Sequence, residues 1–288
     1  MSIKLDRDTP FDLDSTLSCG QVFRWRKIGN TWQGLVGRTY LTLSKVGDRL
    51  TSYKFPEDTC TSFVQRYLRL DDDLHHIVQS INKDEVIAKA IDSFPGLRLV
   101  RQDPWECLIT FICATYANIP RIKQMVENLS QRFGEEIRSV YGTYFAFPRE
   151  EALAKATVKE LVGCGLGFRA RYVLQTARIV YEGFDIKGLR RIKYEDAKKE
   201  LLALPGVGSK VADCVLLFSL DKLEAFPVDV WIYRIMTEHY DRQLPKARPS
   251  AQYRAISDFG RAYFEEHAGY AQEYLYHYFK SRHGVAIS

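Results

Sequence analysis

The chain lacks the cysteine patterns that hold metals and crosslinks. Six cysteines are spread over 288 residues, none of them in a Cys-x-x-Cys pair, and none follows Cys214. This spacing argues against a zinc site, and so low a density argues against a disulfide framework. We therefore expect a reduced, intracellular protein.

Long apolar runs and a strong charge bias are lacking as well. No run approaches the roughly 20 residues of a membrane span, and the polar start MSIKLDRDTPFDLD does not predict a secretory signal. The 41 basic side chains exceed the 36 acidic ones by only five. So mild a bias permits an anionic partner without demanding one.

Two kinds of pattern divide the chain and predict an α+β fold. Residues 20–55 alternate apolar and polar side chains around Gly-Asn and Gly-Asp turns, which predicts antiparallel hairpins. From about residue 58 the spacing becomes helical, and after Asp103 we expect almost nothing but helices. We place an N-terminal antiparallel β-sheet domain with flanking helices at 1–98. A helical core of two subdomains, with a cleft between them, takes up 99–288.

Residues 195–220 predict helix, tight turn, helix, around the stretch LPGVGSKVADC. Gly206 and Gly208 allow positive φ and close approach to a ligand. Ser209 is the expected cap of the second helix. A turn of this kind aims backbone N–H groups outward, so we expect Gly206, Val207 and Gly208 to hold a nucleic-acid phosphate without reading sequence.

Lys210 lies at the start of that second helix, where the helix dipole disfavours a cation. One interpretation is a simple phosphate contact, as in many non-enzymatic hairpins. The other is a neutral amine that acts as a nucleophile in a partly dry pocket. Asp229 follows 19 residues later, before an apolar helix. It is a plausible N-cap whose second oxygen could face the same pocket. Position alone does not choose between these interpretations.

The stretch LPGVGSKVADC…FPVDVW resembles the helix–hairpin–helix DNA glycosylases that carry a Gly/Pro-rich loop and an aspartate. Lysine at this position marks the family members that excise a base and then nick the strand. The motifs SCGQVFRW, FICATYANIPRIKQMVE, GLGFRARYV and GYAQEYLY extend the resemblance, in the same order, to the 8-oxoguanine DNA glycosylases. The iron–sulfur cluster of some relatives is not expected, because its cysteines are missing after Cys214.

The resemblance implies a set of roles. Lys210 attacks C1′ of an everted nucleotide, and Asp229 stabilises the positive charge that develops on the sugar. Cys214 and Tyr276 sandwich the base, while Gln272 reads its Watson–Crick edge. The Gly20 carbonyl accepts a hydrogen bond from N7–H, which guanine lacks, and Gln21 belongs to the same signature. Taken singly, Cys214 reads as a buried small hydrophobe and Tyr270, Tyr274 and Tyr278 as a core stripe.

Other matched positions face the opposite strand. Arg121, Phe168 and Arg169 match residues that contact the orphaned cytosine or wedge the strand, and Asn118 could plug the gap. Taken singly, Arg121 and Arg169 read as exposed surface charges. Tyr116 stands where eukaryotic members have an asparagine that helps to fill the vacated space, so a strict preference for cytosine is not implied.

Together these features predict a bifunctional 8-oxoguanine DNA glycosylase and apurinic/apyrimidinic lyase. Its partner would be duplex DNA that contains 8-oxoguanine, and we expect a monomer that binds no membrane. We expect no required metal or organic cofactor, although a monovalent cation could bind at the hairpin. Trp231, where eukaryotic members have histidine, and a basic chain end without an import cluster favour a bacterial or archaeal protein. We expect it in the cytoplasm, associated with the nucleoid, or in the nucleus if the source is eukaryotic. The alternatives are a glycosylase for another damaged base and a non-catalytic hairpin module that only binds DNA.

Overall fold

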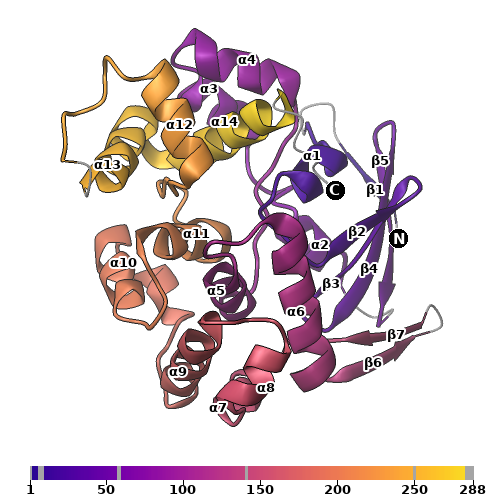
Figure 1. The fold of residues 1–288 in the computed structure, drawn as a ribbon. Coiled ribbons are helices and arrows are strands. Elements are labelled where there is room, and N and C mark those ends of the chain that lie inside the picture. The colour runs from indigo at the N-terminus through magenta and orange to yellow at the C-terminus, as the bar shows by residue number, and fades with distance from the viewer. Residues whose placement is uncertain (1, 6–9, 57–59, 140–141, 249–250, 283–288) are drawn as a thin grey trace.

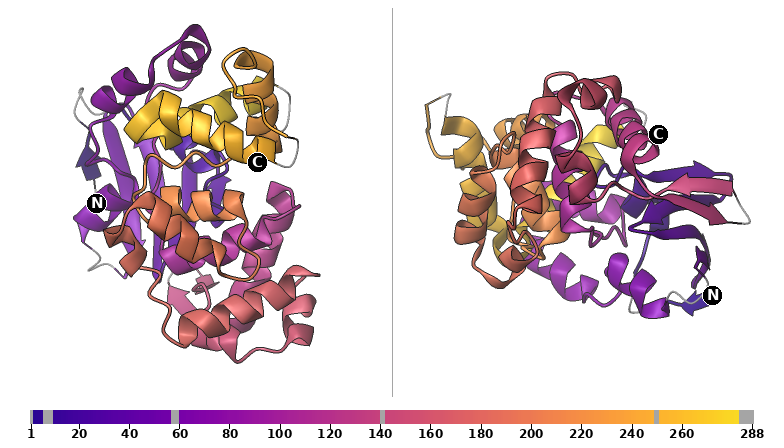
Figure 2. Two further views of the ribbon diagram at one scale, coloured as in Figure 1. Left: turned by 90° about the vertical axis from the view of Figure 1, so that its left-hand side faces the viewer. Right: turned by 90° about the horizontal axis from the view of Figure 1, so that it is seen from below.

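The computed structural model describes residues 2–5, 10–56, 60–139, 142–248 and 251–282. A β-sheet forms one side of the molecule and a larger assembly of helices forms the other (Figure 1). Figure 2 shows the same division from two further directions. Among the described residues, no helix has the length and apolar character needed to cross a membrane.

The sheet has five antiparallel strands in the order β1-β5-β4-β3-β2. They are β1 (Ser2–Lys4), β2 (Trp25–Ile28), β3 (Thr31–Val36), β4 (Thr39–Val46) and β5 (Arg49–Phe55). Gly29, Gly37 and Gly47 each adopt positive φ between consecutive strands, a conformation that glycine takes without strain. The expected hairpins are therefore present, and their apolar face packs on α1 (Leu13–Ser18) and α2 (Thr61–Tyr67).

The helical side begins early in the chain. Its helices are α3 (Leu74–Ile81), α4 (Glu85–Ser93), α5 (Pro104–Cys113), α6 (Ile119–Phe133), α7 (Glu150–Ala154), α8 (Val158–Gly163), α9 (Arg169–Tyr181), α10 (Tyr194–Leu202), α11 (Ser209–Ser219), α12 (Val230–His239), α13 (Gln252–Phe264) and α14 (Ala268–Arg282). Short 3-10 turns occupy Gly188–Arg191 and Glu265–His267. Buried side chains of α3 and α4 belong to the same large core as those of α14. The boundary expected near residue 98 stays a prediction.

A short β-hairpin interrupts the part of the chain for which only helices were expected. Strands β6 (Glu136–Ser139) and β7 (Gly142–Phe145) pair antiparallel. Arg24 of the first sheet region donates to the Phe145 carbonyl, and the Tyr40 and Tyr144 rings stack with centroids 4.2 Å apart. The hairpin is a local departure from the helical core that the sequence predicts, and it was not foreseen because these strands are too short to give a period-two pattern. The hairpin ties the sheet to the helices.

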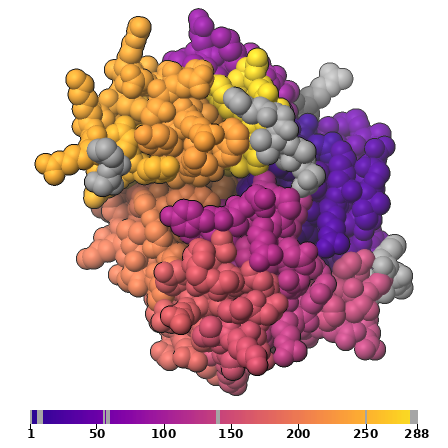
Figure 3. All heavy atoms as spheres, in the orientation of Figure 1, coloured from indigo at the N-terminus to yellow at the C-terminus, as the bar shows by residue number. Residues whose placement is uncertain are grey.

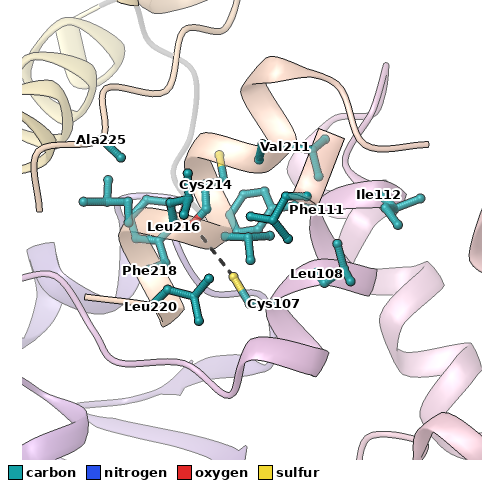
Figure 4. Close-up of a cluster of buried hydrophobic side chains, with 14 of the residues drawn as sticks. Cys107, Leu108, Phe111, Ile112, Val211, Cys214, Leu216, Phe218, Leu220 and Ala225 are labelled. Atoms are coloured by element: carbon teal, nitrogen blue, oxygen red, sulfur yellow. Dashed lines mark hydrogen bonds between the residues drawn. The ribbon is translucent and has the colours of Figure 1, made fainter. Parts of the chain in front are cut away.

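Helix α5 begins directly after Asp103, where the sequence predicts the helical part of the chain to start, and it packs against α11. Asp103 caps α5 through the backbone N–H groups of Trp105 and Glu106, with Pro104 at the first position. Figure 4 shows the buried contact between the two helices, in which the Cys107 thiol lies 4.0 Å from the Cys214 carbonyl oxygen. Because both helices are largely buried, the first turn of α11 is held firmly against α5.

The predicted helix–turn–helix is formed by α10 and α11. Gly206 adopts a φ of +79°, and a Cβ there would lie only 2.6 Å from the Tyr172 Cβ. Gly208 has an extended conformation with a φ of −92° and is itself the N-cap of α11, which leaves Ser209 as the first helical residue. Gly208 therefore does not use the positive φ that a glycine allows, and the expectation that Ser209 caps the helix was wrong.

Candidate functional site

A small cavity lies where the sheet side meets α5, α11 and α14. Its volume is about 50 Å³. The residues that line it are Gly20, Phe111, Lys210, Cys214, Phe218, Pro227, Asp229, Gln272, Glu273 and Tyr276. We call these ten residues the base pocket. Six of the seven residues expected to act on the nucleotide, separated by up to 256 positions, meet here.

Lys210 is the second residue of α11 and is half-buried. Its Nζ lies 5.0 Å from the centroid of the Phe111 ring on α5. The face of an aromatic ring attracts an ammonium group, so the ring holds the Lys210 side chain at the pocket wall. Phe111 was not singled out from the sequence, because an apolar residue in a buried helix carries no signal of this kind.

Asp229 caps α12 and faces the pocket at the same time. Its Oδ1 accepts hydrogen bonds of 2.9 Å from the backbone N–H groups of both Trp231 and Ile232. Neither bond uses Oδ2, and the side chain lines the cavity that also contains Lys210. The cap therefore fixes the carboxylate while one oxygen stays available for chemistry.

Three more pocket residues come from α11 and α14. Burial raises the pKa of the Cys214 thiol to about 12, so this group is a neutral thiol at neutral pH. Gln272 is buried, and its Oε1 has no hydrogen-bond partner among the described residues. The Tyr276 hydroxyl accepts a 2.9 Å hydrogen bond from Lys280 Nζ. Of the predicted core stripe, Tyr270 and Tyr274 are fully buried, whereas Tyr278 is only partly buried.

Gly20 lines the pocket, but its neighbour Gln21 does not. Gly20 has a φ of +105°, and a Cβ there would lie 3.4 Å from Tyr276 Cε1. The Gln21 amide is buried and bonds the carbonyls of Thr16 and Arg98 at 2.8 and 2.9 Å. Its Oε1 accepts from Val100 N at 2.8 Å. The Gln21 side chain thus connects the backbone next to Gly20 to neighbouring segments and does not line the pocket.

The four residues expected to face the opposite strand cluster around the loop between α5 and α6. We call Asn118, Arg121, Phe168 and Arg169 the opposite-strand cluster. Asn118 caps α6 by accepting from Arg121 N at 3.0 Å, and the Arg121 guanidinium donates to the Gly165 carbonyl at 2.7 Å. The Phe168 ring is 56% exposed.

Arg169 is buried, so the surface-charge interpretation of this residue was wrong. Only 8% of it is exposed. Its guanidinium donates to the carbonyls of Thr115 and Tyr116 and lies 4.5 Å from the Phe168 ring centroid. The loop so anchored presents Tyr116, which is 93% exposed and has a φ of +52°. In Figure 3 the segment after α5, coloured purple to magenta, projects at the centre of the face.

Several buried polar groups near the pocket were missed from the sequence. Glu273 is 3% exposed, and burial raises its pKa to about 7. Burial raises the pKa of the nearby Cys19 thiol as well, with a further increase from Glu273. Lys280, 4% exposed, has its pKa lowered by burial. The available signal was a lone glutamate within the apolar stretch AQEYLY.

No metal centre is found in the described part of the chain, where no three His, Cys, Asp or Glu side chains gather closely enough to hold an ion.

Comparisons with known proteins agree with this arrangement. Residues 2–108 match the family described as 8-oxoguanine DNA glycosylase, N-terminal domain. Residues 109–252, half of the chain, match the HhH-GPD superfamily base excision DNA repair protein family.

Individual relatives cover nearly the whole chain. A protein of Methanothermobacter thermautotrophicus named "Probable N-glycosylase/DNA lyase" is 30% identical over 93% of each chain. The N-glycosylase/DNA lyase OGG1 of Arabidopsis thaliana is 32% identical over 93% of this chain and 77% of its own length. The structure of the Clostridium acetobutylicum 8-oxoguanine glycosylase/lyase in complex with DNA is similar, with a TM-score of 0.88 and 32% identity. That match covers 95% of this chain and 93% of the other.

Proposed function

The chain belongs to the 8-oxoguanine DNA glycosylases of the HhH-GPD superfamily, and from that membership we propose how its own residues carry out the reaction. The protein is a bifunctional enzyme that removes 8-oxoguanine from duplex DNA and cleaves the strand at the resulting site. The observation that carries the residue assignment is the convergence of Lys210 and Asp229 on one cavity.

Lys210 is the nucleophile in this proposal. The Lys210 ammonium group first gives up a proton. The resulting neutral amine forms a bond to C1′ as the bond from C1′ to N9 breaks, and the base leaves with that electron pair and takes up a proton. The nitrogen then forms a Schiff base with the ring-opened sugar. Loss of a C2′ proton expels the 3′ phosphate and nicks the strand. Asp229 stabilises the cationic sugar through the oxygen that its helix cap does not use.

The base occupies the pocket between Cys214 and Tyr276, with Gln272 at its Watson–Crick edge. The Gly20 carbonyl accepts from N7–H, and undamaged guanine is rejected because its N7 would place two acceptors face to face. A cavity of about 50 Å³ holds only a few waters at about 10–15 Å³ each, so the walls must open before a purine enters.

We assign the DNA backbone to the turn at Gly206, Val207 and Gly208, which precedes α11. The Val207 N–H already donates to the Leu204 carbonyl within the turn, so the phosphate contacts fall to the N–H groups of the two glycines. The opposite strand meets Asn118, Arg121, Phe168 and Arg169. The protein acts on DNA, which we infer places it in the nucleoid, or in the nucleus of a eukaryotic source.

We further propose that no metal or organic cofactor takes part and that a monovalent cation binds beneath the hairpin carbonyls. The support for the cation is the turn itself, where the carbonyls of Leu204 and Pro205 accept hydrogen bonds from Val207 N and Thr176 Oγ1. Each carbonyl oxygen keeps a second lone pair for a cation. Excision that survives a chelator but falls when potassium is replaced by a bulky organic cation would support both statements.

Borohydride trapping tests the proposal. The wild-type protein should form a covalent adduct with duplex DNA that contains 8-oxoguanine. Lys210→Gln should form none and nick no strand, while it still binds the duplex. Efficient cleavage by this variant would show that the nucleophile is another group.

Trapping on duplexes with other lesions tests the alternative that the enzyme is a glycosylase for a different base. Such an enzyme would form more adduct with another lesion than with 8-oxoguanine. Absence of any adduct with the wild-type protein would instead favour a non-catalytic DNA-binding module.

A further inference from the structure

Glu273 is the one ionisable pocket residue that the proposed reaction does not use. It stands on α14 directly after Gln272 and lines the same cavity as Lys210 and Asp229. A buried glutamate beside a second carboxylate is costly, because the protein interior solvates charge poorly. Its presence in the pocket therefore calls for a function.

The Glu273 carboxyl group is only partly satisfied. The nearby Cys19 thiol donates to the Thr16 carbonyl at 3.4 Å, and Glu273 Oε1 is fully buried without a hydrogen-bond partner among the described residues. Lys280 attracts Glu273 electrostatically, yet its ammonium group donates to the Tyr276 hydroxyl instead. A buried acceptor without a donor costs about 1–3 kcal/mol. A ligand that brings an N–H group to Oε1 would recover that free energy.

Glu273 is not the only acceptor without a donor at this place. Gln272 Oε1 is buried without a partner in the described structure, and no hydrogen bond to the Gly20 carbonyl is found there either. Three acceptors thus converge on one cavity from two distant parts of the chain. Without a ligand, the pocket therefore has hydrogen-bond acceptors for which the described residues supply no donor.

This set of acceptors matches the donors of one base. 8-Oxoguanine carries N–H groups at N7, at N1 and at the exocyclic 2-amino position. The Gln272 amide can accept from N1–H and donate to O6, which leaves the 2-amino group without an acceptor of its own. Opening of the pocket for the base would bring Glu273 Oε1, on the next residue of the helix, to this unfilled position.

We propose that Glu273 is a specificity-determining residue whose carboxyl oxygen accepts a hydrogen bond from the 2-amino group of the everted base, so that the pocket selects purines that carry this group. The proposal rests on the function proposed above and adds a contact to the same site. An acceptor is present whichever way the carboxyl group titrates, since both the acid and the carboxylate have an oxygen without a proton.

The test compares two lesions that differ only in the 2-amino group. Duplexes carry 8-oxoguanine or 8-oxohypoxanthine opposite cytosine, and single-turnover excision is measured for the full chain. The wild type should excise 8-oxoguanine at least about tenfold faster than 8-oxohypoxanthine, because the buried Glu273 acceptor has no donor when the 2-amino group is missing. Glu273→Met, which keeps the length without an acceptor, should slow only 8-oxoguanine and abolish the preference. Glu273→Gln, which keeps an acceptor, should retain most of it.

Two further measurements separate recognition from a structural role. Nicking of a preformed abasic site needs Lys210 but no base, so Glu273→Met should leave it within about twofold of the wild type. Glu266→Met, at an exposed position nearby, is the matched control and should change neither activity. An unchanged lesion preference in Glu273→Met, or an equal loss of abasic-site nicking, would overturn the proposal. A wild type that nicks abasic sites but leaves 8-oxoguanine in place would instead overturn the proposed function.

Discussion

The base pocket and the opposite-strand cluster satisfy their polar groups in opposite ways. In the pocket, Gln272 and Glu273 each hold a buried oxygen that no donor reaches in the described structure. In the cluster, Arg121 and Arg169 are already bound to backbone carbonyls. One region is built to be completed by a ligand, whereas the other is complete by itself and presents aromatic rings to solvent.

The difference teaches where selectivity for each strand originates. Unsatisfied acceptors discriminate strongly, because a wrong ligand leaves them unpaired. Stacking rings tolerate any base, since every base has a π-face. We therefore expect strict reading of the lesion and loose reading of the base opposite. Four substitutions test this comparison, in order of decreasing effect.

Asp229→Asn should slow base excision by about 10²–10³-fold, the range found when one preorganised electrostatic group is removed. Asparagine is as good an N-cap as aspartate, so α12 should remain intact. Single-turnover excision and thermal unfolding check both statements. Asp229→Ala is the companion variant, which should lose the cap as well, at a cost of about 1 kcal/mol. Full excision by Asp229→Asn would remove Asp229 from the chemistry.

Glu273→Gln should stabilise the fold at alkaline pH. Burial raises the pKa of Glu273 from 4.5 to about 7. Well below pH 4.5 Glu273 is protonated in both the folded and the unfolded chain, so its ionisation costs no stability. As pH rises to 7 the unfolded chain ionises first, and above 7 the full cost is present, on the order of 3 kcal/mol. Urea unfolding at pH 5 and pH 8 should show the variant's advantage growing with pH. Equal differences at both values would contradict this.

Arg169→Met should release the loop that follows α5. The guanidinium donates to the Thr115 and Tyr116 carbonyls, and hydrogen bonds to a charged group are worth about 1.5–3 kcal/mol. Hydrogen exchange of the loop amides should become faster and thermal stability should fall. Arg171→Met, an exposed position on the same helix, is the control. Unchanged exchange in Arg169→Met would mean that the loop is held by other contacts.

Tyr116→Asn should give the smallest effect, a several-fold gain in preference for cytosine opposite the lesion, equivalent to about 1 kcal/mol. An exposed ring stacks on any base, whereas an amide forms hydrogen bonds that depend on the base. Excision opposite each of the four bases measures the change. Tyr181→Asn replaces another exposed tyrosine and should leave the preference as it is. A loss of cytosine preference in Tyr116→Asn would reverse the argument.

Much of the pocket could be predicted because its motifs resemble those of a known family. Lys210 follows a glycine turn and Asp229 precedes an apolar helix, but these local signals alone do not separate a catalytic role from a structural one. Gln272 and Tyr276 fall off the core stripe of α14 and therefore invite another role. The α+β division was predictable too, because the change from period two to helical spacing is sharp.

The remaining features depend on tertiary contacts that no short stretch reveals. Arg169 looks like any helix arginine until the loop after α5 folds back over it. Glu273 gains its raised pKa from burial and, to a lesser extent, from the charge of Asp229, which lies 44 positions away. The β6–β7 hairpin is held by Arg24, which precedes β2, and by Tyr40 of β4, both far away in the sequence. Each of these contacts joins parts of the chain whose patterns are independent.

The fastening of Gln21 has a consequence for damage recognition. The nitrogen and the oxygen of its side-chain amide are both hydrogen-bonded, to Thr16, Arg98 and Val100. These bonds hold the neighbouring peptide, so the Gly20 carbonyl cannot rotate away from an acceptor that repels it. A softer backbone at this point would bend to accommodate ordinary guanine. Under the proposed role, discrimination between 8-oxoguanine and guanine thus depends on the rigidity of the Gly20–Gln21 backbone as well as on the hydrogen-bond acceptor that it carries.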